Sequence, residues 1–326
     1  MEKTLLVVAG PTASGKTPCG VELASHYRTE IISADSRQIY REPSIGTAVP
    51  TAAELAAVPH HFVRCISLKQ PYNASMYEHQ VLETLKLLFK KHDLVLMVGG
   101  SGLYIEAVCG GIDDLPSADP VLRNRLHKRL EKEGLASLVD QLSKLDPDSF
   151  KRIDLNNHMR VMKALEVTLQ AGRPYSSFLT GRAKPRPFRI IRVALDLERD
   201  LLYRKINERV DRMMKQGLLG EVEQLKDFRG YTAMKTVGYR ELFRYLDGEC
   251  SLEEAIDLIK RNTRKFARKQ ITWFRKNERY RWIGAGSTAL ENSGSTALEN
   301  SGSTAYKGRS SCVDAIIRYV GTFPPS

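Results

Sequence analysis

Short apolar runs alternate with segments of helical periodicity along much of the chain. Residues 15–27 and 76–91 repeat their apolar positions at helical spacing, and a strand-end loop with a short helix is expected at 35–40. The runs with the character of buried strands are residues 4–9, 30–33, 94–98 and 189–195. This alternation predicts an α/β fold, with a parallel sheet flanked by helices.

A segment without strand character interrupts this alternation. Between about residues 115 and 182, basic and leucine positions interleave at helical spacing. They are Arg123, Arg125, Lys128, Arg129, Lys132, Leu122, Leu126 and Leu130. We therefore expect an all-helical insertion domain at 115–187 in a core made of 1–114 and 188–283. In the second part of that core, helices are expected at 199–228, 238–247 and 252–277.

The last forty residues have a different composition. Residues 286–305 contain an eight-residue tandem repeat, Gly-Ser-Thr-Ala-Leu-Glu-Asn-Ser, with one leucine in each period. Such a period is too short for a solenoid unit and buries no apolar stripe, so a flexible linker is expected. Residues 306–326 include Val313, Ile316, Ile317 and Val320, which predict one docked terminal helix.

Composition narrows the class of protein. The 326 residues allow two domains, and no apolar run approaches the ~18–20 residues of a membrane span. The net charge is +12, but residues 1–120 hold 10 Lys and Arg against 13 Asp and Glu, whereas the remainder holds 40 against 25. The basic excess therefore belongs to the second part of the chain and indicates a polyanionic partner there.

Cysteine usage indicates a reducing compartment. The five cysteines are odd in number, widely spaced and form no CxxC pair, which argues against a disulfide framework and a zinc site. The apolar run at the N-terminus is followed by glycine and lacks a cleavage-site pattern, so it is expected to be a strand and not a signal peptide. A cytoplasmic location is predicted.

A phosphate-binding loop follows the first expected strand. The pattern G-x-x-x-x-G-K-[ST] is met by Gly10, Pro11, Thr12, Ala13, Ser14, Gly15, Lys16 and Thr17. In the context of strand, loop and helix, the backbone N–H groups form a nest for phosphate oxygens, Lys16 adds a positive charge and Thr17 can hold Mg²⁺. A ligand with a diphosphate or triphosphate is expected, and a fortuitous glycine-rich turn is the alternative.

The acid that a P-loop hydrolase places after a neighbouring strand is missing, since Leu94 to Val98 is followed by two glycines. Instead, Asp35 follows the second strand, at the carboxyl edge where open α/β sheets bind ligands. Asp35 can act as a general base, a metal ligand or only a helix N-cap. Ser101, in a glycine turn at the same edge, can orient a reacting group or simply form the turn.

Basic residues dominate the last helix of the expected core. From 260 to 281 there are ten Lys and Arg and one acid, Glu278, and Arg261, Arg264, Lys265, Arg268 and Lys269 recur at steps of three and four. Solvated helix faces usually mix the two signs. This face hardly does, which favours binding to a phosphate backbone.

Together these motifs resemble the bacterial tRNA dimethylallyltransferases over about residues 4 to 283. The resemblance lies in the ordered combination Asp35 to Tyr40, Ile45 to Ala48, Pro59 to His61, Gly99 to Tyr104, Arg160 to Val167 and Lys269 to Phe274. It implies a P-loop NTPase-like core with an inserted tRNA-binding domain. The implied reaction transfers a dimethylallyl group from dimethylallyl diphosphate to the exocyclic N6 amine of the adenine 3′-adjacent to the anticodon, releasing diphosphate.

The resemblance also implies roles for individual residues. Asp35 would be the general base, assisted by Ser101, and Arg209 would contact the diphosphate beside the P-loop, unless it only pairs with Glu208 or Asp211. The tRNA contacts would be Asp35, Ser36, Arg37, Gln38, Arg123, Met159, Arg160, Val161, Met162, Lys163, Arg268, Lys269 and Gln270. The target base would be extruded into a channel ending at Asp35. The implied cofactor is Mg²⁺ on Thr17, and the partners are the tRNA anticodon stem-loop and dimethylallyl diphosphate, with no membrane; a monomer is expected.

Three features depart from the family pattern: Arg64 after the histidine pair, Pro18-Cys19 in the P-loop helix, and the 286–305 repeat. Two other functions compete with the transferase. A P-loop small-molecule kinase would use ATP and needs no basic helix, and a non-catalytic RNA-binding protein needs neither Asp35 nor Lys16. The P-loop and the basic helix together favour the transferase.

Overall fold

The computed structural model describes residues 2–116, 119–285 and 311–323. Its centre is a six-stranded parallel sheet, and the predicted α/β fold is confirmed. The strands, in their order across the sheet, are β3 (His60–His61), β2 (Ile31–Ala34), β4 (Leu94–Gly99), β1 (Thr4–Ala9), β5 (Arg189–Asp196) and β6 (Arg281–Gly284). Strands β3 and β6 at the two edges were not predicted, because neither contains an apolar run of strand length.

The chain divides into two compact units. One consists of residues 1–110 and 186–326 and contains the sheet; the other is residues 111–185. The insertion expected at 115–187 begins and ends a few residues from these boundaries.

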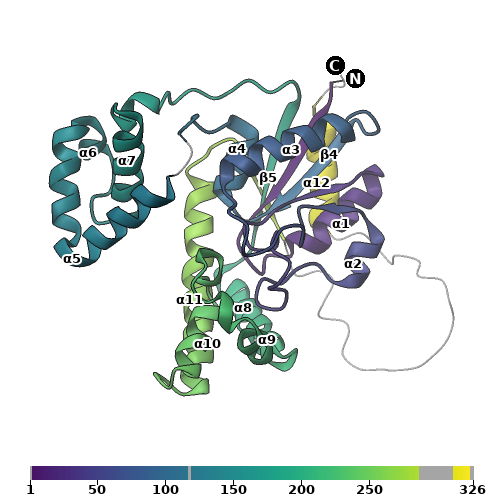
Figure 1. Ribbon diagram of the computed structural model, residues 1–326. Coiled ribbons are helices and arrows are strands. Elements are labelled where there is room, and N and C mark those ends of the chain that lie inside the picture. Colours follow the sequence, from purple (N-terminus) through teal and green to yellow (C-terminus); the bar gives the residue numbers. More distant parts are fainter. Residues whose placement is uncertain (1, 117–118, 286–310, 324–326) are drawn as a thin grey trace. The chain divides into compact units, whose positions relative to one another are not determined.

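Alternating side chains of β1 set the two layers around the sheet. Leu5, Val7 and Ala9 pack in a core with α3 (Ala74–Leu88) and α4 (Gly102–Gly110), whereas Leu6 and Val8 pack in a second core. The second core holds α1 (Lys16–Tyr27) and α12 (Ser311–Gly321), so both faces of the sheet are covered. In Figure 1 the purple α1 and the yellow α12 lie together, on the other side of the strands from α3.

The prediction of one continuous helix at 199–228 is wrong. The structure has α8 (Arg199–Lys215), α9 (Leu218–Gln224) and a 3-10 turn at Lys226–Phe228. Gly217 separates the helices with φ 94°, a left-handed conformation that a continuous helix does not contain. A further 3-10 turn, Thr232–Met234, precedes α10 (Tyr239–Leu246) and α11 (Leu252–Arg275), which confirm the next two predicted helices. A short helix, α2 (Ala52–Ala57), lies before β3.

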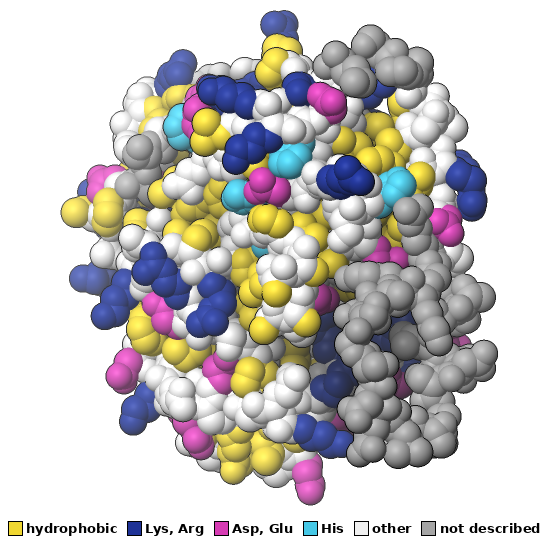
Figure 2. All heavy atoms as spheres, turned by 90° about the vertical axis from the view of Figure 1, so that its right-hand side faces the viewer, with side chains coloured by type: hydrophobic (Ala, Val, Ile, Leu, Met, Phe, Trp, Pro, Cys, Tyr) yellow, Lys and Arg dark blue, Asp and Glu magenta, His cyan; other side chains and the backbone are white. Residues whose placement is uncertain are grey.

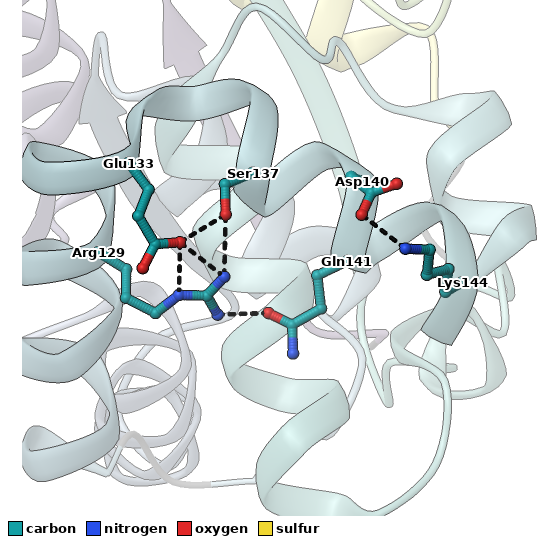
Figure 3. A network of polar contacts seen from close by, with 6 residues as sticks. All are labelled: Arg129, Glu133, Ser137, Asp140, Gln141 and Lys144. Carbon is teal, nitrogen blue, oxygen red and sulfur yellow. Dashed lines mark hydrogen bonds and ion pairs between the residues drawn. The ribbon is translucent and has the colours of Figure 1, made fainter.

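The second unit contains only helices among its described residues, as predicted. They are α5 (Pro120–Leu145), α6 (Pro147–Arg152), α7 (His158–Ala171) and the 3-10 turn Tyr175–Phe178. Helix α5 is kinked at Gly134, where φ is 78°. Figure 3 shows how Arg129, before the kink, donates to Ser137 and Gln141 after it and also pairs with Glu133. One of the basic residues of this helix therefore stabilises the kink.

The predicted terminal helix is present as α12, with Val313 and Ile316 fully buried. The repeat at 286–305 lies outside the described residues. Within the described part of the chain, no helix combines the length and the apolar character needed to cross a bilayer.

Candidate active site

The P-loop connects the end of β1 to the start of α1. Gly15 is the N-cap of α1, and Lys16 and Thr17 form its first turn. The Lys16 ammonium donates to the carbonyl of Pro11 across the loop at 2.6 Å. The hydroxyl of Ser14 is buried and has no hydrogen-bond partner in the described structure. A loop with an unpartnered hydroxyl and free helix N–H groups is suited to an oxyanion.

Asp35 stands directly after β2, and turns at 36–39 follow it in place of the short helix that was expected there. One carboxylate oxygen, Oδ1, accepts from the backbone N–H groups of Arg37 at 2.8 Å and Gln38 at 3.3 Å. No hydrogen bond to Oδ2 occurs among the described residues. Asp35 therefore caps the turn with Oδ1 only, as in the capping alternative, and Oδ2 remains available to a ligand.

Ser101 lies beside this turn and fixes its backbone. Its hydroxyl accepts from the N–H of Ser36 at 2.9 Å and donates to the Ser36 hydroxyl at 3.2 Å. The N–H of Ser101 donates to Ala34, so the turn after β4 is joined to the end of β2. Ser101 thus positions the segment that carries Asp35.

Two half-buried cations, Lys16 and Arg209, lie near Asp35 without forming an ion pair with it in the described structure. Burial, followed by the charge of Arg209, lowers the pKa of Lys16 from 10.5 to about 7, and Asp35 opposes this shift. Burial also lowers the pKa of Arg209, against the opposing effect of Asp35. Asp211, an alternative partner of Arg209, instead pairs with Lys260 at 2.6 Å. Half-buried positive charge with a strongly shifted pKa is typical of a functional site, here one that suits an anion.

Two cavities meet at these residues. The first, here called the P-loop pocket, has a volume of about 490 Å³ and is bordered by the P-loop, by residues 44–54 and by α8. The second, here called the channel, has a volume of about 220 Å³ and contains Asp35 and Ser101. Lys16, Thr17, Ala48 and Arg209 border both cavities. A ligand in one cavity can therefore contact some of the residues that also border the other.

Several residues that line these cavities were missed by sequence reasoning. Arg212, one helical turn after Arg209, borders the P-loop pocket. Ile259, Thr263 and Phe266, together with the already expected Gln270, form one stripe of α11 along the channel. Their spacing of four, three and four residues was the available signal, because such positions share a helix face.

Gln270 differs from the other tRNA contacts expected on α11. Its amide oxygen accepts from the N–H of Thr12 at 2.8 Å, and its amide nitrogen donates to the carbonyl of Gly100 at 3.0 Å. Its amide therefore bridges the P-loop and the turn before Ser101. Arg268 and Lys269 are exposed and border a shallow hollow with Lys265, Thr272, Trp273 and Lys276.

The face of the molecule in Figure 2 does not show a cluster of basic side chains like that on α11. There, Lys and Arg side chains are interspersed with acidic and apolar ones over the surface that the described residues form. Residues 260–281, with ten Lys and Arg and one acid, are therefore more uniformly basic than this mixed surface.

In the second unit, the expected tRNA contacts separate into two groups. Met159 and Arg160 are exposed on α7, and Lys163 is half-buried. Val161 and Met162 are buried in the core of that unit, so their side chains do not reach the surface. Arg123 is about half exposed and pairs with the buried Glu166 at 2.9 Å. Arg123 is therefore not a free surface side chain: it forms an ion pair with Glu166, and part of its guanidinium is still exposed.

This site defines a P-loop protein in which a phosphate pocket opens into a channel with a carboxylate. The model of the family described as IPP transferase matches residues 38–277. A tRNA dimethylallyltransferase 1 of Phocaeicola vulgatus is 48% identical over 283 residues, covering 87% of this chain and 94% of the relative. A tRNA dimethylallyltransferase 1 of Bacteroides thetaiotaomicron is 47% identical over 280 residues, covering 86% and 91%.

Solved structures agree with these relatives. The tRNA isopentenylpyrophosphate transferase of Bacillus halodurans has a TM-score of 0.63 and 38% identity, covering 87% of this chain and 90% of its own. A eukaryotic dimethylallyltransferase described as acting on tRNA, at 23% identity and a TM-score of 0.73, shares the fold. The chain belongs to the IPP transferase family. The predicted enzyme class, tRNA dimethylallyltransferase, is confirmed, and the kinase alternative is not favoured.

Proposed function

We propose that the chain transfers the dimethylallyl group of dimethylallyl diphosphate to the N6 amine of the adenine 3′-adjacent to the anticodon, releasing diphosphate. The observation that carries this proposal is the junction of the two cavities. Asp35 lies in the channel, and the channel shares Lys16, Thr17 and Arg209 with the P-loop pocket. A diphosphate at the P-loop and a base beside Asp35 would therefore place the leaving group and the nucleophile in one continuous space.

The P-loop supplies stabilisation for the leaving group. As the allylic C–O bond breaks, its electron pair and negative charge pass to the diphosphate oxygen. The N–H groups at the start of α1, together with the half-buried Lys16 and Arg209, lie where this charge develops, in a region that the protein partly shields from water. Arg212 adds a cation at the outer side of the pocket.

Asp35 acts on the nucleophile. When the N6 nitrogen forms its bond to the allylic carbon, one N–H proton has to leave, and the free Oδ2 of Asp35 accepts it. The hydrogen bonds to Oδ1 from Arg37 and Gln38, and the link between Ser36 and Ser101, hold the carboxylate in the channel. Ser101 is thus a positioning residue in this mechanism.

The donor groups present fit Mg²⁺ held mainly by the substrate. Thr17 borders both cavities, and no cluster of three metal-ligating side chains occurs among the residues described. Mg²⁺ commonly takes few protein ligands and several phosphate oxygens and waters. We therefore assign it to the Thr17 hydroxyl and the diphosphate, where it would supply charge neutralisation.

The acceptor is tRNA, bound through its anticodon stem-loop. On α11, Arg268 and Lys269 are exposed close to the half-exposed aromatic side chains of Phe266 and Trp273. Cations interleaved with aromatic rings are typical of surfaces that bind unstacked nucleic acid. Phe266 also borders the channel, which joins this surface to Asp35. We further propose a monomeric cytoplasmic enzyme.

One incubation tests the proposed function directly. Purified protein is mixed with bulk tRNA, Mg²⁺ and labelled dimethylallyl diphosphate, and parallel reactions contain labelled ATP. We expect label from dimethylallyl diphosphate in the adenine beside the anticodon. Transfer from ATP to any small hydroxyl compound, without prenylation of tRNA, would establish a kinase instead.

Lys269→Ala is expected to weaken tRNA binding and to reduce its salt dependence. Loss of one phosphate contact lowers the slope of log K against log salt by about one and affects different tRNAs almost equally. Fluorescence anisotropy across a salt series measures the slope, and calorimetry measures diphosphate binding, which should not change. An equal loss of affinity for both ligands would contradict the division between α11 and the P-loop.

Diphosphate binding is expected to take up a proton above neutral pH. In the free protein the pKa of Lys16 is about 7, so this ammonium is largely deprotonated at pH 8. A bound polyanion favours the charged form and raises that pKa. Affinity should therefore fall as pH rises through 7, beyond the effect of the ligand's own ionisation. Calorimetry in buffers of different ionisation enthalpy measures the uptake, and Lys16→Arg, which stays protonated, should abolish it.

A further inference from the structure

One carboxylate outside both cavities gathers an unusual set of hydrogen bonds. Glu221, on α9, accepts at Oε2 from the N–H and the hydroxyl of Ser44 and from the N–H of Ile45, at 2.7–2.8 Å. At Oε1 it accepts from the N–H of Gly46 at 3.0 Å and from the hydroxyl of Tyr239 at 2.5 Å. Three consecutive backbone N–H groups of one loop therefore converge on a single side chain.

The carboxylate is held in its charged form. Burial by itself would raise the pKa of Glu221, but the hydrogen bonds from Gly46, Tyr239, Ser44 and Ile45 outweigh it and lower the pKa. Hydrogen bonds to an ionised acceptor are about twice as strong as neutral ones. The arrangement thus fixes the loop at 44–46 to α9 and α10 more firmly than backbone contacts alone would.

The same loop forms the wall between the two cavities. Ser44 and Ile45 border the P-loop pocket, Gly46 and Thr47 border the channel, and Ala48 borders both. Gly46 also packs so closely on Tyr239 that an added Cβ would lie 2.5 Å from its ring. The loop has little room to move while Glu221 and Tyr239 are in place.

A second set of contacts joins this loop to Asp35. The Gln38 amide nitrogen donates to the carbonyl of Ala48 at 2.7 Å, and the Gln38 N–H is one of the two donors to Oδ1 of Asp35. The chain of contacts therefore runs from Glu221 through the loop at 44–48 and Gln38 to Asp35. None of these contacts requires Glu221 to reach a substrate.

We infer that Glu221 is a positioning residue, which sets the wall of the P-loop pocket and, through Gln38, the carboxylate of Asp35. Without it, three backbone N–H groups lose their charged acceptor and the loop at 44–48 is free to leave the junction of the cavities. The inference rests on the proposed assignment of the P-loop pocket to the diphosphate. It adds a residue to that function without altering the reaction.

Graded variants test this role. Glu221→Ala removes all five interactions and should raise KM for dimethylallyl diphosphate at least about tenfold and lower kcat, because each hydrogen bond to a charged group contributes substantially. Glu221→Gln should be intermediate. The Ser44 and Tyr239 hydroxyls can rotate to accept from its amide, but the N–H of Gly46 cannot. Tyr239→Phe removes one donor only and should have the smallest effect.

Three measurements separate positioning from general stability. Glu223→Ala, an exposed acid on the same helix, is the matched control and should leave KM and kcat unchanged. Anisotropy with anticodon stem-loop RNA should show unchanged affinity in all variants. Thermal unfolding identifies any variant that fails to fold. If Glu221→Ala does not fold, the kinetic constants of Glu221→Gln and Tyr239→Phe test the positioning role instead.

Outcomes for the inference differ from those for the proposed function. A folded Glu221→Ala protein with wild-type KM and kcat, or equal effects of Glu221 and Glu223 substitutions, would overturn the positioning role. Failure of the wild-type protein to bind dimethylallyl diphosphate at all would instead reject the proposed function. The role is supported if KM rises most in Glu221→Ala, less in Glu221→Gln and least in Tyr239→Phe.

Discussion

Asp35→Asn is expected to lower kcat for transfer to tRNA by roughly 10²–10⁴-fold, the usual contribution of a general base. The amide keeps the shape of the carboxylate, and its oxygen can still accept from the N–H groups of Arg37 and Gln38. What it loses is the capacity to take the N6 proton. Single-turnover transfer measures the rate, and binding of tRNA should stay within about twofold because the turn is preserved.

Two comparisons make this result specific. Asp93→Asn makes the same chemical change just before β4, at the opposite end of the sheet, and should leave the rate unchanged. Asp35→Ala removes the cap as well as the base, and any additional loss of tRNA affinity in that variant reports on the turn. Full activity of Asp35→Asn would mean that another group takes the proton.

The strand, loop and helix around Lys16 could be predicted because each part carries a local signal. The apolar run of β1 has strand length, the glycines have the P-loop spacing, and Val21, Leu23 and Ala24 repeat at helical positions in α1. Parallel pairing then follows from the alternation of elements. Asp35 could be placed near Lys16 for the same reason, since the carboxyl ends of parallel strands meet at one edge.

Residues that act through long-range hydrogen bonds carried no such signal. Glu221 reads as an ordinary acid on a helix surface, and only the break at Gly217 turns α9 so that it meets Ser44. Gln270 belongs to a basic run and was therefore assigned to tRNA, although its amide bridges Thr12 and Gly100. Val161 and Met162 lie within an expected tRNA segment, yet helical periodicity turns both into the core. In each case the partner is remote in sequence.

Two peculiarities of the sequence, Cys19 and the terminal segment, meet in the structure. Cys19 is buried on α1, and a hydrogen bond with Cys312 of α12, together with burial, raises the pKa of its thiol. Val313 and Ile316 enter the same core as Leu6 and Val8 of β1. The terminal helix is therefore part of the layer that supports the P-loop helix.

Removal of α12 by ending the chain at Ala285 is consequently expected to prevent stable folding. Full burial of an aliphatic side chain contributes about 1.5–3 kcal/mol, and α12 buries Val313 and Ile316 fully while covering other apolar side chains of that core. Their combined loss is comparable to the ~5–15 kcal/mol that stabilises a typical domain. Expression of the shortened chain should give mostly insoluble protein, which sedimentation of the lysate measures.

Ile316→Ala in the full-length chain measures how much the packing of α12 contributes to stability. Deleting a buried isoleucine side chain costs about 2–5 kcal/mol, which corresponds to a fall in Tm of roughly 4–10 °C in a unit of this size. Arg318→Ala, exposed on the same helix, should leave Tm nearly unchanged. Because α1 carries Lys16 and Thr17, saturating diphosphate should raise the Tm of both variants by mass action on the native state. Equal Tm values for wild type and Ile316→Ala would show that α12 does not support this layer in solution.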